Sequence, residues 1–504
     1  MSTPVVDCYV PPMRSWTAPL TCSLLLLAAC GDDGSPSDTE STSGASTDSS
    51  GSAGPTTNPT TGASTGPGPD DTTTGAMTTE VADSSSGDPP PAECGDGQQN
   101  IGEQCDDGNE VDDDECSNDC VARCGEVWNE NMPADFAALS MSLDSTGNVV
   151  VFGGQIDAGM TMASPARRVY AEDGMFVGDE VSTVAWVDVP LGHAVHDAND
   201  NTFMFVEVTE MGEAGPTLRL YKFDTAMAEQ FDVPIAPPVF LGANDLPAEV
   251  DVSPEGDAVL VAATEVADGD DDIWVAKYSG VDGTELWSTT HSGPLQGGFS
   301  TDQAGRVAVA DDGTIYVAAR IRNTFNEQPV VVLRFSPDGG PAEIEEVVFP
   351  DPGANNDQLA AAIATNGTQT AIGVSVFGGG VVNSSSVVGL LEGDAVAWTV
   401  EAVDDLEPTK NVSIGWARPA VAIDAEGNVL VAHSEEIDPD PTDGFIDVEV
   451  VMARYDSTGA LQCGQRWAVL DSFRRPLSAE VLSDGSMVAF GTGGAGPWIA
   501  RFRR

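Results

Sequence analysis

Clustered acidic side chains are the most conspicuous chemistry in this 504-residue sequence. One cluster lies in a cysteine-rich stretch, and calcium, which takes roughly six to eight oxygen ligands, is the metal that such side chains would hold. The spacing is not that of an EF-hand, and a solvated acidic face is the favoured interpretation. The sequence therefore predicts no cofactor, with calcium as the one alternative. The candidate ligands are Asp106, Asp107, Asn109, Asp112, Asp113 and Asp114.

Two further acidic stretches are predicted in loops. Alternating carboxylates in a loop could also hold calcium, although a solvated loop is the default for such runs. These stretches contain Asp268, Asp270, Asp271 and Asp272, and then Asp438, Asp440 and Asp443.

Side chains suited to catalysis are scarce. The chain has four His, and it lacks the common nucleophile-elbow, phosphate-loop and zinc-protease motifs. His193, His196 and His433 could meet at the mouth of a ring-shaped fold, where they would hold a metal. Lone histidines on strands are more often structural, so the sequence favours a protein without a catalytic site.

Four cysteines within 27 residues point to a disulfide-stapled module, because this stretch has almost no apolar residues to form a core. They are Cys94, Cys105, Cys116 and Cys120. We expect two disulfides among them, with three pairings open. Cys124 and Cys463 remain; their equivalent positions in neighbouring repeats predict that they lie some way apart, so a bond between them is the less favoured hypothesis.

The same stretch resembles a known repeat. It reads Cys94-Gly-Asp-Gly, then Gly-Glu-Gln-Cys105-Asp-Asp-Gly-Asn, then Cys116-Ser-Asn-Asp-Cys120. This order is similar to the myxobacterial cysteine-rich repeat of exported proteins. The pair Asp114-Glu115 departs from the Asp-Gly of that repeat. The resemblance implies export and disulfides, and no activity.

The N-terminal residues resemble a secretion signal. Arg14 precedes a short apolar run, Leu20 to Ala29, which ends in Leu27-Ala-Ala-Cys30. This ending is similar to the lipobox of bacterial lipoproteins, whose cysteine is acylated. We therefore expect a signal peptide over residues 1–29 and a lipid on Cys30. Several acyl chains anchor a protein stably, so we expect attachment to the bacterial outer membrane or the cell surface.

Residues 30–92 have the composition of a disordered tether. Of the 62 residues from Gly31 to Ala92, 43 are Ser, Thr, Gly or Pro, and none is Lys, Arg or aromatic. Such a segment buries too little apolar surface to fold. The whole chain has 81 Asp+Glu against 20 Lys+Arg, a net charge of −61, which argues against nucleic acid as a partner.

Seven internal repeats follow the cysteine-rich module, which we place at residues 93–123. Each has a short apolar strand, a turn with Asp, Asn or Gly, and a second apolar strand; turns fall at residues 147, 200, 256, 313, 367, 427 and 485. A second hairpin gives four strands, as in a propeller blade. The seventh repeat stops one strand short, and residues 125–131 can complete it. The sequence predicts an all-β, seven-bladed β-propeller over residues 124–504.

Some short segments of these repeats resemble the repeats of quinoprotein-like propellers, for example Tyr278-Ser-Gly-Val-Asp-Gly-Thr-Glu-Leu-Trp287. A quinone cofactor would need several cations in one pocket. Lys222, Lys277 and Lys410 are too scattered to supply them. We expect the Trp residues to pack between blades.

The sequence thus predicts a monomeric, non-catalytic, lipid-anchored protein of the cell envelope. Its propeller would bind or scaffold a protein, glycan or cation ligand. The alternative is a secreted propeller enzyme acting on polysaccharide, or a quinoprotein-like dehydrogenase. Fold alone cannot decide between these functions.

Overall fold

A computed structural model describes residues 95, 105–106, 108, 116–118 and 121–504. Within the last range it omits residues 160–161, 214, 236–248, 268–269, 294–301, 322–328, 341–342, 346–356, 378–383, 394, 403–418, 438–446, 468–474 and 494–495. Pro91–Arg504 form one compact unit. Among these described residues, there is no helix that is long and apolar enough to span a bilayer.

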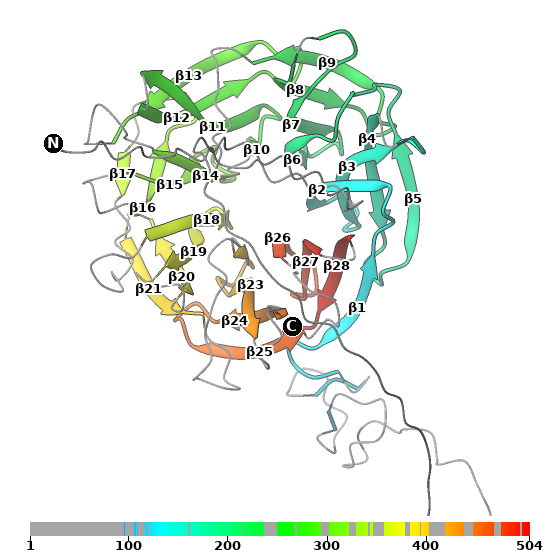
Figure 1. Cartoon of the computed structure of the whole chain (residues 1–504). Helices are drawn as coiled ribbons and strands as arrows, with labels where there is room; N and C mark the ends of the chain where they lie inside the picture. Colours follow the sequence, from blue (N-terminus) through cyan, green and yellow to red (C-terminus); the bar gives the residue numbers. More distant parts are fainter. Residues whose placement is uncertain are drawn as a thin grey trace, which may run out of the picture. The chain divides into compact units, whose positions relative to one another are not determined.

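The propeller consists of seven four-stranded antiparallel sheets arranged in a ring, as predicted (Figure 1). Blades 1 to 3 are β2 (Phe136–Leu143), β3 (Val149–Ile156), β4 (Ala163–Tyr170), β5 (Phe176–Val181); β6 (Leu191–His196), β7 (Thr202–Val208), β8 (Thr217–Phe223), β9 (Glu229–Pro234); and β10 (Glu249–Val252), β11 (Ala258–Ala267), β12 (Asp270–Tyr278), β13 (Glu285–His291). Blades 4 and 5 are β14 (Gln303–Val309), β15 (Ile315–Arg320), β16 (Val330–Phe335), β17 (Glu343–Glu345); and β18 (Asp357–Thr365), β19 (Gln369–Phe377), β20 (Ser384–Glu392), β21 (Ala395–Glu401). Blade 6 is β22 (Ala420–Ile423), β23 (Val429–Ile437), β24 (Asp447–Tyr455), β25 (Leu461–Trp467), and blade 7 is β26 (Arg475–Val481), β27 (Met487–Gly493), β28 (Gly496–Phe502) and β1 (Glu126–Asn131).

Apolar runs in the second and third strands of each blade build the core. These strands are covered on both faces by neighbouring blades, so they are apolar at successive positions and not only at alternate ones. Phe205 of blade 2, for example, packs against Trp274 of blade 3, with ring centroids 6.5 Å apart. The fourth strands lie at the rim and are largely exposed.

Much of the acidity that the sequence shows is used in turns. Asp424 follows the first strand of blade 6, and its Oδ1 accepts the backbone N–H groups of Glu426 and Asn428 at 3.0 and 2.8 Å. Its Oδ2 accepts Asn428 Nδ2 at 2.7 Å. This carboxylate replaces backbone acceptors that a tight turn lacks. Asp144, Asp197 and Asp456 have the same role, and these hydrogen bonds lower their pKa values although burial opposes them.

The two ends of the propeller complete one blade, as the repeat count predicted. β1 pairs antiparallel with β28, from Glu126 opposite Phe502 to Asn131 opposite Trp498. Blade 7 therefore contains strands from both ends of the chain (Figure 1). The pairing gives the outer edge of β28 a partner strand, which it would otherwise lack.

An aromatic latch joins the rims of several neighbouring blades. Trp287, early in the outer strand of blade 3, lies against Gly339 in the second hairpin turn of blade 4, and its Nε1 donates a hydrogen bond of 3.1 Å to the carbonyl oxygen of Pro337. A Cβ atom at Gly339 would lie 2.4 Å from the indole ring. The same arrangement joins Trp128 to Gly174 and Trp398 to Gly459.

A disulfide takes the place of this latch between blades 6 and 7, which corrects the expectation that Cys124 and Cys463 lie apart. Their Cα atoms are 6.0 Å apart and their sulfurs are bonded. Cys463 pairs with Arg454 just as Trp128 pairs with Arg501, so Cys463 occupies the latch position. Cys124 has a positive φ of 55°, the conformation of the turn glycines. The prediction failed because it aligned Cys463 with Cys124 instead of with Trp128.

We expect the latch to make Gly459 intolerant of a side chain. Its φ is +84° and a Cβ atom would lie 2.8 Å from Trp398, whereas Gly147, with φ +85°, has nothing within 4 Å. Gly459→Ala should therefore cost about 3 kcal/mol, and Gly147→Ala about 1 kcal/mol, because only the first adds a clash to the backbone strain. Chemical denaturation measures both. Equal costs would show that the latch does not matter.

Candidate functional site

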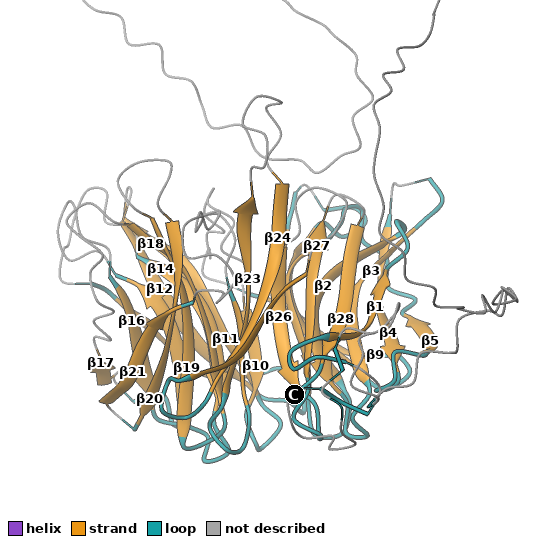
Figure 2. Ribbon diagram, turned by 90° about the horizontal axis from the view of Figure 1, so that it is seen from below, coloured by secondary structure: helices purple, strands orange, loops and turns teal. Residues whose placement is uncertain are grey.

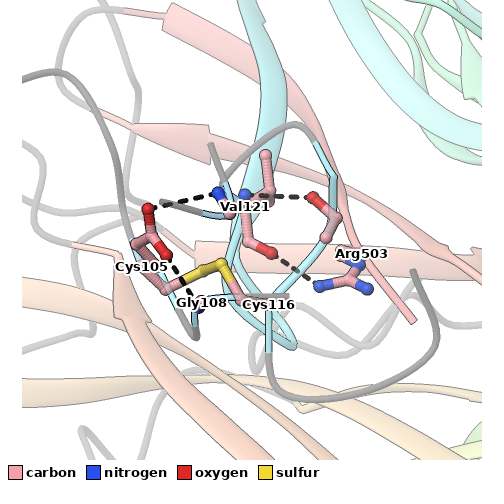
Figure 3. The surroundings of a disulfide bond; sticks show 8 residues. Cys105, Gly108, Cys116, Val121 and Arg503 are labelled. Carbon is pink, nitrogen blue, oxygen red and sulfur yellow. Dashed lines mark hydrogen bonds between the residues drawn. A yellow bond between two sulfur atoms is a disulfide. The ribbon is translucent and has the colours of Figure 1, made fainter. Parts of the chain in front are cut away.

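Two of the four module cysteines are described, and they form one disulfide. Cys105 and Cys116 have Cα atoms 5.8 Å apart (Figure 3). Beside them, Asp106 accepts the N–H groups of Gly108 at 2.8 Å and of Gly95 at 3.2 Å. Both oxygens of this predicted calcium ligand are thus used within the module. The remaining predicted residues of the module, Cys94, Asp107, Asn109, Asp112, Asp113, Asp114 and Cys120, lie outside the described residues, as does Cys30.

The end of the module is attached to the C-terminal strand of the propeller. Arg503 Nη1 donates to the carbonyl oxygen of Val121 at 2.6 Å (Figure 3), and the backbone N–H of Arg503 donates to Gly125 at 2.9 Å. Residues 121–125 are therefore fixed beside β28 before β1 begins.

Of the other predicted metal ligands, the structure describes only three, and these lie in one strand. Asp270, Asp271 and Asp272 belong to strand β12 and not to a loop, and Asp272 is buried and accepts Ser292 Oγ at 2.6 Å. Asp268, Asp438, Asp440 and Asp443 lie outside the described residues. Within the described part of the chain, no three His, Cys, Asp or Glu side chains are placed to hold a metal ion.

The three predicted histidines also lie apart. His193 and His196 are on β6 of blade 2, whereas His433 is on β23 of blade 6. Burial lowers the pKa of both His196 and His433 to about 4, and for His196 the nearby Arg167 adds to the effect. These two histidines are structural, buried and neutral at pH 7.

Basic residues recur at one position of the repeat, and they include two of the three lysines considered for a quinone pocket. In five blades the third strand has Lys or Arg opposite the outer strand, and in four of these an acidic residue of the same blade's first turn pairs with it. The pairs are Lys222–Asp197 at 3.3 Å, Lys277–Asp257 at 3.4 Å, Arg454–Asp424 at 2.7 Å and Arg501–Asp484 at 2.5 Å; the fifth residue is Arg334. Lys410 lies outside the described residues. The four paired cations thus fasten the first turns of their blades.

Titratable side chains from three blades meet near the axis of the ring, where one of them also contacts the backbone of a fourth blade. His193, Glu249 and Arg306 each lie seven residues before the first turn of their blade, on the innermost strands β6, β10 and β14. Glu249 Oε2 is 3.6 Å from His193 Nδ1, and Glu249 Oε1 is 3.7 Å from Arg306 Nε. Arg306 Nη2 also donates to the carbonyl oxygen of Leu477 in blade 7. Arg306 therefore spans the axis, and Glu249 lies between His193 and Arg306.

A second layer lies two residues nearer the turns and carries two acids. Asp251 is on β10 and Glu480 on β26, each five residues before its turn glycine. Burial raises the pKa of Asp251 to about 6, assisted by Glu249 and opposed by hydrogen bonds from Val252 and Val309. Burial and Asp251 raise the pKa of Glu480 to about 7, against the effect of Arg306.

These two carboxyls differ from the turn and rim carboxylates. Neither has an ion-pair partner among the described residues, and both side chains keep part of their surface exposed although protein surrounds them. We call Asp251 and Glu480, with His193, Glu249 and Arg306, the axial cluster.

An open cleft of about 230 Å³ has Val252, the neighbour of Asp251 in the chain, in its lining, whereas Asp251 and Glu480 do not line it. It is lined by the first turns of blades 2, 3 and 4, which with the other short turns gather at one face of the ring (Figure 2). The lining includes Val252 and Val309, whose backbone N–H groups both donate to Asp251. Asp197, Glu255 and Asp311 add acidity to the lining. We call this cleft with Asp251 and Glu480 the acidic mouth.

No protein-family model and no curated protein matches the chain. Among solved structures, a polysaccharide lyase described as an ulvan lyase is 11% identical with a TM-score of 0.46, covering 74% of this chain and 95% of the lyase. A quinohemoprotein alcohol dehydrogenase from Pseudomonas putida HK5 is 10% identical with a TM-score of 0.39, covering 75% and 76%. An α-L-arabinanase from Penicillium chrysogenum is 13% identical with a TM-score of 0.38, covering 62% and 92%. These are similarities of fold, and no activity follows from them.

The axial cluster was absent from the sequence-based candidates, apart from His193. A signal existed, because Glu249 and Arg306 lie seven residues before a turn glycine, and Asp251 and Glu480 lie five residues before one. In blade 6 the two equivalent positions of the innermost strand have the small residues Ala420 and Ala422, so charged residues at these positions are unusual. Aligning the repeats on their turns, and not on their apolar strands, reveals the two layers.

Proposed function

We propose that the chain is an exported, non-catalytic binding protein, anchored to the cell envelope through a lipid on Cys30, whose propeller receives a positively charged ligand at the acidic mouth. The observation that supports it most is the pair Asp251 and Glu480, which form no ion pair with any described residue, although Arg306 is near enough to lower the pKa of Glu480. A ligand cation would supply an ion-pair partner. The cleft beside Asp251 provides room for it.

The lipid anchor rests on the sequence alone, and its test is direct. Mass spectrometry of the mature protein should find an acylated Cys30 at the N-terminus, because the Leu-Ala-Ala-Cys ending directs both cleavage and acylation. Cys30→Ala should move the protein from the membrane fraction to the soluble fraction. An unmodified N-terminus at any other residue would contradict the anchor.

We expect binding at the acidic mouth to strengthen as the pH rises. The two carboxyls ionise between about pH 6 and 7. At pH 5 about one Glu480 in a hundred would be ionised, so a ligand that needs this carboxylate should bind about a hundredfold more weakly than at pH 8. Calorimetric titration with pentalysine, and separately with calcium chloride, measures this and tells a basic peptide from a metal ion.

Matched variants distinguish the mouth from the general acidity of the protein. Asp251→Asn/Glu480→Gln should weaken pentalysine binding at pH 8 at least about tenfold, equivalent to about 1.4 kcal/mol. The control Glu130→Gln/Glu401→Gln removes the same charge from exposed positions of the outer strands β1 and β21. If both variants lose affinity equally, binding is a nonspecific effect of charge.

An enzyme that cleaves polysaccharide is the second candidate. Asp251 and Glu480 face one axis with pKa values of about 6 and 7, which suits a base and an acid at neutral pH. In that case Glu480→Gln should abolish the release of new chain ends from polysaccharide while leaving the fold intact. A wild-type protein that releases none would favour the binding function.

A further inference from the structure

We propose that the Cys124–Cys463 disulfide is a mechanical clamp. When the N-terminal tether is pulled, the disulfide transmits the force to blade 6, so that the force does not act on the hydrogen bonds between β1 and β28. The physiological setting rests on the proposed lipid anchor. The clamp itself is tested without a membrane, so failure of one proposal does not decide the other.

The closing strand is weakly held on its own. β1 pairs only with β28, because it is the outermost strand of blade 7. Most of its residues are exposed, and Val127 keeps 45% of its surface in solvent. Trp128 provides its main side-chain attachment, through the hydrogen bond of 3.0 Å from Nε1 to the carbonyl oxygen of Glu172.

The direction of the pairing makes this strand vulnerable to pulling. Glu126 lies opposite Phe502, so the first residue of β1 and the last residue of β28 are at the same end of the ladder. Tension applied between the N-terminal segment and the propeller would open the pairs one after another from that end. In a ladder that opens from one end, only the hydrogen bonds of one residue pair resist the force at any moment.

The disulfide lies ahead of the first of these pairs. Any tension from residues before 124 reaches Cys124 before it reaches Glu126, and the bond passes it to Cys463 in β25. β25 is joined by a ladder to β24 from Leu461 to Trp467. Because the bond occupies the position of the aromatic latch, it also fixes the rim of blade 6 to that of blade 7. β1 is thereby removed from the path of the force.

Optical tweezers with handles on the two ends of the full chain test the clamp. In Cys124→Ser/Cys463→Ser, β1 should open first at about half the first rupture force of the wild type, because one ladder and not two resists. Release of residues 124–131 should lengthen the chain by about 25–30 Å. The wild type should lack this early step. An unchanged first rupture force, or the early step in the wild type, would overturn the proposal.

A second variant separates the clamp from disulfides in general and from failure to fold. Cys105→Ser/Cys116→Ser removes the Cys105–Cys116 disulfide, leaves Cys124–Cys463 in place, and should keep the wild-type first rupture force. Adding a water-soluble phosphine to this folded variant during pulling reduces Cys124–Cys463 to two thiols, while the phosphine is oxidised to its oxide. The early 25–30 Å step should then appear. Its absence after reduction, confirmed by thiol labelling of Cys124, would contradict the clamp.

Discussion

Deleting residues 125–131 should destabilise the propeller by on the order of 5 kcal/mol, because the ladder to β28 spans five residue pairs and each lost hydrogen bond costs about 1 kcal/mol net. The deletion also removes Trp128 from its latch on Gly174. It exposes the outer edge of β28, whose Trp498 and Ile499 are fully buried in the intact ring. Thermal and denaturant unfolding should show the loss, and an unpaired edge should promote aggregation.

A permuted chain is the matched control for this deletion. If residues 124–131 follow Arg504 through a short turn and the chain begins at Met132, blade 7 gains the strand order of the other six blades. Stability should return to that of the wild type. Deleting residues 31–90 should leave the melting temperature unchanged, because their composition predicts no packing. A stable 125–131 deletion, or a permuted chain as weak as the deletion, would refute the role of the closing strand.

The sequence predicted the architecture because both the length of the repeat and the point at which it starts and stops can be read from the turns. Seven turns at regular intervals specify seven blades, and a last repeat that lacks its fourth strand specifies closure by residues 125–131. The structure confirms both, with β1 at Glu126–Asn131. The Cys124–Cys463 bond was missed by a four-residue error in aligning the outer strands. Only the pairing of Cys463 with Arg454 and of Trp128 with Arg501 reveals the correct register.

The acidic mouth was harder to predict for a physical reason. Carboxylates that bind turns and carboxylates that face the axis have the same residue type, and both lie within a few residues of a turn. Asp424 accepts hydrogen bonds from its own turn, whereas Glu480 makes none to any described residue. Burial then raises the pKa of Glu480 to about 7. Such differences arise from the packing of distant blades, so a single repeat does not show them and only the alignment of all repeats on their turns does.

Replacing Arg454 should have the largest effect among the repeated basic residues. Arg454 and Asp424 are both about 95% buried, and Arg454 Nη1 also donates to the carbonyl oxygen of Gly485 in blade 7 at 3.1 Å. Arg454→Met would leave the Asp424 carboxylate buried without its cation, which costs about 3–5 kcal/mol. Denaturant unfolding at pH 7 measures this loss.

Arg501 tests whether burial decides that cost, because it has the same position in blade 7. Its partners Asp484 and Glu172 keep 48% and 44% of their side-chain surface exposed, so water can solvate them when the cation is removed. Arg501→Met should therefore cost at most about 1 kcal/mol. Adding Asp424→Asn to Arg454→Met should recover part of the larger loss, since the amide oxygen still accepts the turn N–H groups without carrying a charge. An equal loss of unfolding free energy in Arg501→Met and Arg454→Met would contradict this explanation. The basic residues would then stabilise the blades through the contacts that span them, and not through burial of the ion pair.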